Sequence, residues 1–536
     1  MLRPGRIRLH STRIADIVSY DNEAPLRFCR NNLLQIKETR GFSMPSYDPG
    51  SLTAGVLNIG LGNFHMVHNA VFFDSLLNIP GNKSWGIVSV GIDHAQRRVQ
   101  SELKIQDNLY TVVAKNASGL SDIRMIGSII DTLQFPDESA RIAELVSRKE
   151  IRMVTLAIDE INYHFDREFT RLDLENPSIA HDILTGGASR PFLTVAGILV
   201  AGLHQRFLKK GAPISILSCD NLSRNGEKAR TMVESFALSK YPLKTGFHRW
   251  LSASVFYPNT VCDRICLTDP SKDRIALQQT FGVLDNALLT TEAYSEWVVE
   301  KWMGTKPEGM EDVGIKMVSS TLPYENVKMR LNYGCRLSVA IVSLAMGLKT
   351  FKEAMEHPNI AVFADLYMRE ASHGLGEVPK NFSVDKHIRM IKERIATPEL
   401  EYLTQKVAAY ASKKIIMDWK PVLESLPFGH TAPIIAFSLS VWIHLLARSP
   451  MLTQNRGCTP IIDCNQSILE RSAEEVVATV ELTGGPDAVN KFLTLVFGTD
   501  SPVTQSMKEP LLSSLRDINK LGIEEALRKF TSSISK

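Results

Sequence analysis

The chain has 536 residues, of which 44% are hydrophobic, so it is long enough to bury large cores and to form two or more domains. Its 61 basic and 58 acidic residues nearly cancel to a formal charge of +3, which argues against partners that bind by charge, such as nucleic acid or a membrane surface. Seven cysteines without a C-x-x-C pair indicate neither a disulfide framework nor a zinc site, so we predict no metal.

The first 28 residues are predicted to be an extension outside the folded domains. They contain several arginines and no acidic residue before Asp16, which is the composition of a mitochondrial presequence. A disordered basic tail has the same composition. No run in the chain reaches the roughly 18 uncharged apolar residues of a membrane span. We therefore expect a cytoplasmic or mitochondrial protein without a membrane segment.

The segment 56–60 is an apolar run that ends in a glycine-rich turn and continues into a helical pattern as far as Leu77. Gly60 and Gly62 have the spacing of a tight turn that lets the backbone approach a pyrophosphate at the start of a helix. The usual third glycine is replaced by His65. The pattern therefore predicts a dinucleotide-binding turn, although an ordinary turn between a strand and a helix has the same residues.

A second apolar run, 87–91, is followed by Asp93, where a dinucleotide-binding fold places a carboxylate to accept hydrogen bonds from the ribose of the adenosine. Its distance from Gly60 is longer than the roughly 20 residues that are usual. Arg97 and Arg98 follow closely and could instead bind the 2′-phosphate of NADP. Asp93 favours NAD, so we predict NAD and leave NADP possible.

The rest of the chain changes character near residue 312. Residues 29–312 alternate β-rich runs, including 153–158 and 214–218, with helical stretches, which is typical of an open parallel sheet. Residues 313–536 are a succession of helical patterns. We predict an α/β fold with a Rossmann-type domain over 29–312 and a mainly α-helical domain over 313–536 that carries substrate-binding and catalytic groups, with the active site in the cleft between them.

The helical domain begins with a polar stripe. At about 100° per residue, Asn332 lies roughly 40° and Arg336 roughly 80° from Lys328 around a helix. A lysine beside another cation can serve as a general base, which suggests a proton-transfer site. A solvated helix face has the same pattern.

Six segments in this order resemble the polyol-specific long-chain dehydrogenases, a family that includes mannitol 2-dehydrogenase and fructuronate reductase. These segments are 60–70, 106–111, 126–129, 218–226, 256–265 and 323–328. The resemblance runs from about residue 31 to the C-terminus. It implies a zinc-independent oxidoreductase that interconverts a secondary alcohol and a ketone with a nicotinamide cofactor.

The resemblance also implies roles for single residues. Lys328 matches the catalytic lysine of the family, and Glu325 matches a glutamate thought to control proton exit. Asn221 matches an asparagine that polarises the reacting oxygen, and Asp263 matches an aspartate near the same site. The implied cofactor-binding residues are Gly60, Gly62, Phe64 and Asp93.

The lysine helix departs from the family pattern, which has asparagine five and histidine eight residues after the lysine. Here Tyr333 and Arg336 occupy those places, and Asn332 comes one position early. We predict that Asn332, Tyr333 and Arg336 bind the substrate. A permanent guanidinium charge favours an anionic substrate such as a sugar acid, unless Arg336 pairs with an acid such as Glu325.

The function predicted from these observations is hydride transfer between a nicotinamide cofactor and a polyol, ketose or sugar acid, by a monomer or small homo-oligomer. Lys328 is the expected base and Asn221 the group that stabilises the alkoxide. The altered lysine helix leaves one alternative open, a homologue that binds dinucleotide without turnover and acts as a regulator or scaffold.

Overall fold

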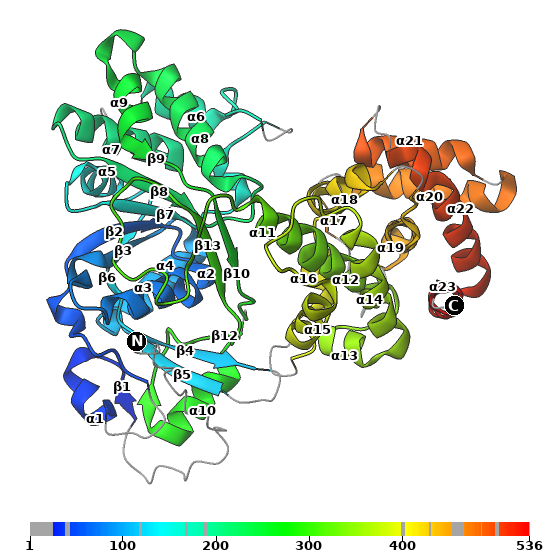
Figure 1. The fold of residues 1–536 in the computed structure, drawn as a ribbon, viewed down its shortest axis with the longest axis horizontal. Helices are drawn as coiled ribbons and strands as arrows, with labels where there is room; N and C mark the ends of the chain where they lie inside the picture. Colours follow the sequence, from blue (N-terminus) through cyan, green and yellow to red (C-terminus); the bar gives the residue numbers. More distant parts are fainter. Residues whose placement is uncertain are drawn as a thin grey trace. The chain divides into compact units, whose positions relative to one another are not determined.

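The computed structural model describes residues 25–37, 43–116, 121–166, 170–185, 190–267, 269–397, 402–427, 430–452, 462–463, 466–483, 485–498 and 503–534. The chain divides into two compact units, Met1–Thr321 and Leu322–Lys536 (Figure 1). Most of the predicted N-terminal extension, residues 1–24, lies outside the described residues, and so does the prediction of a targeting signal.

The first unit is built on a sheet of six parallel strands in the order β6-β3-β2-β7-β8-β9 (Figure 1). In chain order these strands are β2 (Ala54–Ile59), β3 (Gly86–Gly91), β6 (Ile129–Gln134), β7 (Met153–Leu156), β8 (Ile214–Ser218) and β9 (Val255–Phe256). The order runs outward from β2 on one side and from β7 on the other, as in a Rossmann sheet that binds a dinucleotide where the order reverses. The predicted Rossmann-type fold is confirmed, and four of its strands lie within two residues of their predicted bounds.

Helices cover both faces of this sheet. In chain order the helices of the first unit are α1 (Leu33–Lys37), α2 (Asn63–Val67), α3 (Asn69–Leu77), α4 (His94–Ile105), α5 (Ser139–Ser147), α6 (Pro177–Leu184), α7 (Val195–Leu208), α8 (Asn225–Lys240), α9 (Phe247–Ser254) and α10 (Ser271–Phe281). Leu57 and Ile59 pack with α5, α7, α8 and α9, whereas Val56 packs with α2 and α3 on the opposite face. Burial on both faces explains why the strands are continuous apolar runs rather than alternating ones.

Three small sheets complete the first unit. Their strands are β1 (Leu26–Arg27), β4 (Tyr110–Lys115), β5 (Ser121–Ile126), β10 (Thr260–Asp263), β11 (Val283–Leu284), β12 (Leu289–Glu292), β13 (Glu296–Glu300) and β14 (Lys316–Val318). Because β1 pairs with β11 and Phe28 is fully buried, the last residues of the predicted extension belong to the fold. Because β14 pairs with β13, the first unit also continues past the predicted boundary at residue 312.

The described part of the second unit is helical. In chain order it contains α11 (Leu322–Asn326), the π-helical turn η7 (Val327–Tyr333), α12 (Gly334–Ala345), α13 (Phe351–Glu356), α14 (Pro358–Ser372), α15 (Val384–Ile395), α16 (Thr404–Ala408), α17 (Ala411–Lys414), the π-helical turn η9 (Ile415–Trp419), α18 (Lys420–Ser425), α19 (Pro433–Leu452), α20 (Gln466–Thr483), α21 (Pro486–Phe497), α22 (Val503–Leu521) and α23 (Ile523–Ile534). Among the described residues, no helix has the length and apolarity needed to cross a membrane.

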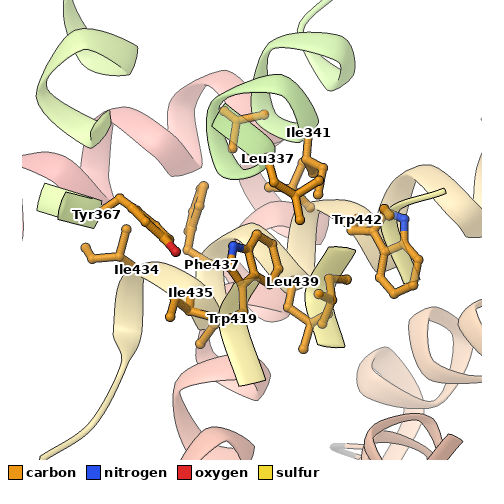
Figure 2. Close-up of a cluster of buried hydrophobic side chains, with 14 of the residues drawn as sticks. Leu337, Ile341, Tyr367, Trp419, Ile434, Ile435, Phe437, Leu439 and Trp442 are labelled. Carbon is orange, nitrogen blue, oxygen red and sulfur yellow. The ribbon is translucent and has the colours of Figure 1, made fainter. Parts of the chain in front are cut away.

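The centre of the second unit is the apolar helix α19. Its buried side chains, among them Phe437 and Trp442, pack with Leu337 of α12, Tyr367 of α14 and Trp419 of η9 (Figure 2). This core bears on the turn that carries Lys328, because α12 continues directly from it, Tyr367 bonds to the turn, and Trp419 bonds to Gly334, the first residue of α12.

Candidate active site

The turn after β2 requires glycine at Gly60 for reasons internal to the fold. Its φ is +103°, and a Cβ atom there would lie 2.0 Å from the carbonyl oxygen of Ala157, at the end of the neighbouring strand β7. The N–H groups of Gly60 and Leu61 both donate to the carbonyl oxygen of Val90, at 2.8 and 3.0 Å. The turn is therefore held between β3 and β7, at the point where the strand order reverses.

Gly62 differs, because nothing in the fold requires glycine there. Its φ is −91°, and a Cβ atom would have no neighbour closer than the Nε2 of Gln96 at 3.9 Å. The space that a side chain would fill lies at the N-terminus of α2, where backbone N–H groups can receive an anion. The turn thus fits the pyrophosphate of a dinucleotide. The predicted cofactor residue Phe64 is half-buried one residue into α2 and stacks on His68 with ring centroids 4.9 Å apart.

His65, which replaces the third glycine of the fingerprint, is a buried part of the core. Its Nε2 lies 2.9 Å from the hydroxyl oxygen of Ser89 in β3, and burial lowers the pKa of its imidazole to about 3. The ring is therefore neutral at physiological pH. Its contact with Ser89 joins α2 to the sheet. In the usual fingerprint, the third glycine does this by letting the helix pack closely against the strand.

Asp93 lies two residues after β3 and is exposed. Its Oδ1 accepts a hydrogen bond from the backbone N–H of Gln96, and its Oδ2 accepts one from the side-chain amide of the same residue, both at 2.8 Å. Asp93 therefore caps α4, and its carboxylate retains further acceptor sites for a ribose. Arg97 forms an exposed ion pair with Asp137 at 2.7 Å. Asp137 therefore competes with a 2′-phosphate for Arg97, although an exposed ion pair costs little free energy to break.

Asn221 follows β8 and is exposed. Asp220, the residue before it, is held by hydrogen bonds from two other residues. Asp220 accepts hydrogen bonds from the backbone N–H of Asp159 at 3.0 Å and from the hydroxyl of Tyr163 at 2.8 Å. Burial raises the pKa of Asp220 to about 7, although these hydrogen bonds oppose the rise. Asp220 thus ties the loop after β8 to the loop after β7. The sequence analysis missed it, and its position at the carboxyl end of a parallel strand was the available signal.

Asp263 ends β10 and is 1% exposed, opposite Glu296 of β13. The segment that carries it is joined to the segment that carries Asn221 through Asn225. The Asn225 side-chain amide donates to the carbonyl oxygens of Asp220 at 3.1 Å and Thr260 at 3.0 Å. The structure therefore brings the two segments together.

Lys328 lies on a π-helical turn, not on the α-helix that the sequence analysis assumed. The N–H of Gly334 bonds to the carbonyl oxygens of Leu331 and Met329, three and five residues earlier, and not to that of Arg330. The hydroxyl of Tyr367 donates to the carbonyl oxygen of Arg330 at 3.1 Å, which that N–H would otherwise reach in an α-helix. The indole N–H of Trp419 donates to the carbonyl oxygen of Gly334 at 3.2 Å. Figure 2 shows Tyr367 and Trp419 beside the core of α19.

Gly334 makes this arrangement possible, because a Cβ atom there would lie 2.0 Å from the hydroxyl oxygen of Tyr367. A π-helix has about 4.4 residues per turn, so Tyr333 lies within about 50° of Lys328, whereas an α-helix would place it about 140° away. The turn therefore rotates Tyr333 onto the face of the lysine. π-helical turns are frequent at functional sites.

The contacts of the turn follow from that rotation. The Nζ of Lys328 lies 5.2 Å from the ring centroid of Tyr333, and the guanidinium carbon of Arg336 lies 5.3 Å from the same centroid. Arg336 also lies 6.0 Å from the ring of Tyr402, a residue that the sequence analysis did not select. Lys328 and Arg336 are 5% and 3% exposed. Three of the predicted site residues thus share one face.

Asn332 and Glu325 lie on the same segment with other neighbours. The side-chain oxygen of Asn332 is hydrogen-bonded to the Nε2 of His387 in α15. Burial lowers the pKa of the Arg330 guanidinium, and the negative charge of Glu325 opposes this decrease. His387 was also missed by the sequence analysis, because it comes 55 residues after Asn332 and no local pattern connects them.

The comparisons with known proteins cover both units. A family model described as the mannitol dehydrogenase Rossmann domain matches residues 54–309. The mannitol 2-dehydrogenase of Aspergillus clavatus is 30% identical over 519 residues, which span 95% of this chain and 99% of the relative. The mannitol 2-dehydrogenase of Neosartorya fischeri is 27% identical over 517 residues, with the same coverage. The chain belongs to the mannitol dehydrogenase family.

Two solved structures share the fold of this mannitol dehydrogenase family member over 94–95% of the chain. Pseudomonas fluorescens mannitol 2-dehydrogenase, in a ternary complex with NAD and D-mannitol, has a TM-score of 0.81 at 24% identity, covering 95% of this chain and 100% of that one. A D-sorbitol dehydrogenase in substrate-free form has a TM-score of 0.76 at 21% identity, covering 94% and 100%. In the described part of the chain, no group of three or more His, Cys, Asp or Glu side chains could hold a metal ion.

Proposed function

We propose that this protein is an NAD-dependent oxidoreductase that interconverts a secondary alcohol of a polyol or sugar acid with its ketone, without zinc. The observation that carries the proposal is the 30% identity to a mannitol 2-dehydrogenase along 95% of the chain, because it includes both units. The Rossmann sheet, the open space at Gly62 and the face shared by Lys328, Tyr333 and Arg336 support it.

In this proposal the first unit holds the cofactor. The backbone of the turn at Gly60 and Gly62 faces the pyrophosphate, and Asp93 accepts hydrogen bonds from the ribose. Phe64, in the first turn of α2, lies beside the cofactor. A negative Asp93 repels a 2′-phosphate, and Arg97 is paired with Asp137, so NAD is preferred over NADP. When bound, the nicotinamide cofactor would supply the hydride acceptor in oxidation and the hydride donor in reduction.

The second unit supplies the proton transfer. The Nζ of Lys328 accepts the proton of the reacting hydroxyl during oxidation and returns it to the alkoxide during reduction. Glu325, one helical turn earlier, passes the proton onward to solvent. Asn332, Tyr333 and Arg336 bind the remaining hydroxyls, or a carboxylate, of the substrate.

Two residues of the first unit complete the proposed chemistry. The side-chain amide of Asn221 donates a hydrogen bond to the oxygen that becomes an alkoxide, which lowers the barrier because the bond strengthens as charge develops. Asp263, whose segment is joined to that of Asn221 through Asn225, accepts a hydrogen bond from a neighbouring substrate hydroxyl.

The test is a steady-state screen of the purified protein with NAD and NADP against polyols, sugar acids and the corresponding ketoses and keto-acids, at neutral and alkaline pH. NAD-dependent oxidation of at least one secondary alcohol is expected. Dinucleotide binding with no turnover on any of these compounds would refute the proposal and favour the non-catalytic alternative. Size measurement in solution would at the same time test the proposed monomer or small homo-oligomer, and fractionation of cells the proposed cytoplasmic or mitochondrial location.

A further inference from the structure

The strand β7 ends beside the nucleotide turn. In the sheet β3 and β7 flank β2, and the carboxyl ends of the three strands lie at the same edge because the strands are parallel. The carbonyl oxygen of Ala157, just after β7, is the atom that a Cβ atom at Gly60 would meet. Asp93 follows β3 and Asp159 follows β7. The two aspartates therefore lie on either side of the turn.

The backbone of Asp159 has a conformation that few residues other than glycine adopt. Its φ is +61° and its ψ is 155°, a region that is strained for any residue with a Cβ atom. The N–H of Asp159 donates to Oδ1 of Asp220 at 3.0 Å, and Oδ2 of Asp220 accepts a hydrogen bond from the hydroxyl of Tyr163 at 2.8 Å. These bonds hold the backbone in place, and a glycine would make the same backbone bond without the strain.

The side chain of Asp159 does little for the fold. Asp159 precedes the short helix η5 (Glu160–Tyr163), but its side chain does not cap that helix. Asp159 is exposed, and its carboxylate receives no hydrogen bond from any residue that the structure describes. Partial desolvation of the carboxyl and the negative charge of Asp93 raise the pKa of Asp159, so the two carboxylates interact across the turn. A strained residue whose side chain the fold does not use is typical of a ligand-binding site.

The chemistry of a dinucleotide fits these two carboxylates. Its two riboses lie on either side of the pyrophosphate, and each has neighbouring hydroxyls that can donate hydrogen bonds to a carboxylate. In the proposed function the turn at Gly60 and Gly62 receives the pyrophosphate, and Asp93 receives the ribose of adenosine. The second ribose then passes toward β7, where Asp159 is the acid beside the turn.

We propose that the carboxylate of Asp159 binds the ribose on the nicotinamide side of NAD. The inference rests on the proposed function and deepens it, because it gives the cofactor site a second ribose-binding acid. It also explains why an aspartate occupies a position where glycine would be less strained. The side chain stabilises the bound cofactor and lowers the stability of the free protein.

The test measures the Kd of NAD, ADP-ribose, ADP and AMP by calorimetric titration of the parent and of Asp159→Gly. NAD and ADP-ribose contain the second ribose, whereas ADP and AMP lack it. Asp159→Gly should raise the Kd for NAD and ADP-ribose by about 10-fold to 100-fold, as loss of a hydrogen bond to a charged group does, and should leave the Kd for ADP and AMP within about twofold. Asp159→Asn, whose oxygen can still accept a hydrogen bond, should raise the Kd for NAD less than Asp159→Gly does.

Thermal unfolding without cofactor separates binding from folding. Asp159→Gly relieves the backbone strain, so its Tm should equal or exceed that of the parent. Lys210→Gly is the matched control, because Lys210 also has a positive φ, of +52°. Lys210 lies between α7 and the start of β8, at the opposite edge of the sheet. Lys210→Gly should therefore leave the Kd for NAD unchanged.

The outcomes distinguish this role from the proposed function. If the parent binds neither NAD nor NADP, the proposed function fails and the role of Asp159 fails with it. If the parent binds NAD and Asp159→Gly raises the Kd by less than about fivefold, only the role of Asp159 fails. The role is also overturned if the variant weakens ADP as strongly as NAD, because the lost contact would then lie on the adenosine side. A lower Tm for Asp159→Gly than for the parent would overturn it as well, because the carboxylate would then stabilise the fold.

Discussion

Replacing each glycine of the nucleotide turn by alanine should separate what the fold needs from what the cofactor needs. In Gly60→Ala, the φ of +103° is unfavourable for alanine, and the new Cβ would lie 2.0 Å from the carbonyl oxygen of Ala157. Backbone strain of about 1–3 kcal/mol and overpacking of about 1–3 kcal/mol together predict a loss of about 2–6 kcal/mol in the free energy of unfolding. For a unit of this size, a loss near the middle of that range lowers Tm by roughly 10 °C.

Gly62→Ala should behave in the opposite way. Its φ is ordinary and the nearest atom to the new Cβ is 3.9 Å away, so the free energy of unfolding should change by less than about 1 kcal/mol. The methyl group would occupy the space where a pyrophosphate approaches the backbone. Loss of one hydrogen bond to a charged group costs about 1.5–3 kcal/mol, which raises the Kd for NAD by about 10-fold to 100-fold.

The assay combines thermal unfolding without cofactor and calorimetric titration with NAD for the parent and the two variants. Gly62→Ala serves as the matched control for Gly60→Ala, because each change adds the same methyl group to the same turn. If Gly62→Ala binds NAD within threefold of the parent, the pyrophosphate does not lie at this turn. If Gly60→Ala has the same Tm as the parent, the close approach to Ala157 does not constrain the fold.

Four further predictions concern other residues. Lys328→Ala should lower kcat by about 10²-fold to 10⁴-fold and leave the Kd for NADH unchanged, and a rate within threefold of the parent would exclude it as the base. Tyr367→Phe removes the hydroxyl that bonds to the carbonyl oxygen of Arg330, so kcat should fall with little change in NADH binding; a parental kcat would show that the π-helical turn holds without it. Arg336→His should reduce the ratio of kcat/KM for sugar acids to kcat/KM for neutral polyols by about tenfold or more, and an unchanged ratio would mean that Arg336 does not meet the substrate. Because burial raises the pKa of Asp220 to about 7, the folded state binds this proton more tightly than the unfolded state. Its stabilising effect is complete below about pH 4 and is lost as pH rises through 7, so the free energy of unfolding of the parent relative to Asp220→Asn should decrease between pH 4 and 8, and a constant difference would contradict the shift.

The sequence alone determined the elements whose signal is local. Apolar runs identified the strands β2, β3, β7 and β8, because burial on both faces of a parallel sheet leaves a continuous apolar pattern. The ordered motifs likewise pointed to the family and to Lys328. These signals lie within a few residues of one another, so one chain is enough to read them.

The tertiary structure decided how the residues of those motifs work together. Gly60 and Gly62 look alike in the sequence, and only the position of Ala157 on the neighbouring strand shows that the fold needs the first. The carbonyl of Arg330 within the π-helical turn accepts its hydrogen bond from Tyr367, which comes from another helix, so helical periodicity around Lys328 assumed the wrong pitch. Contacts between residues distant along the chain carry no periodic signal, and these contacts set the geometry around Lys328.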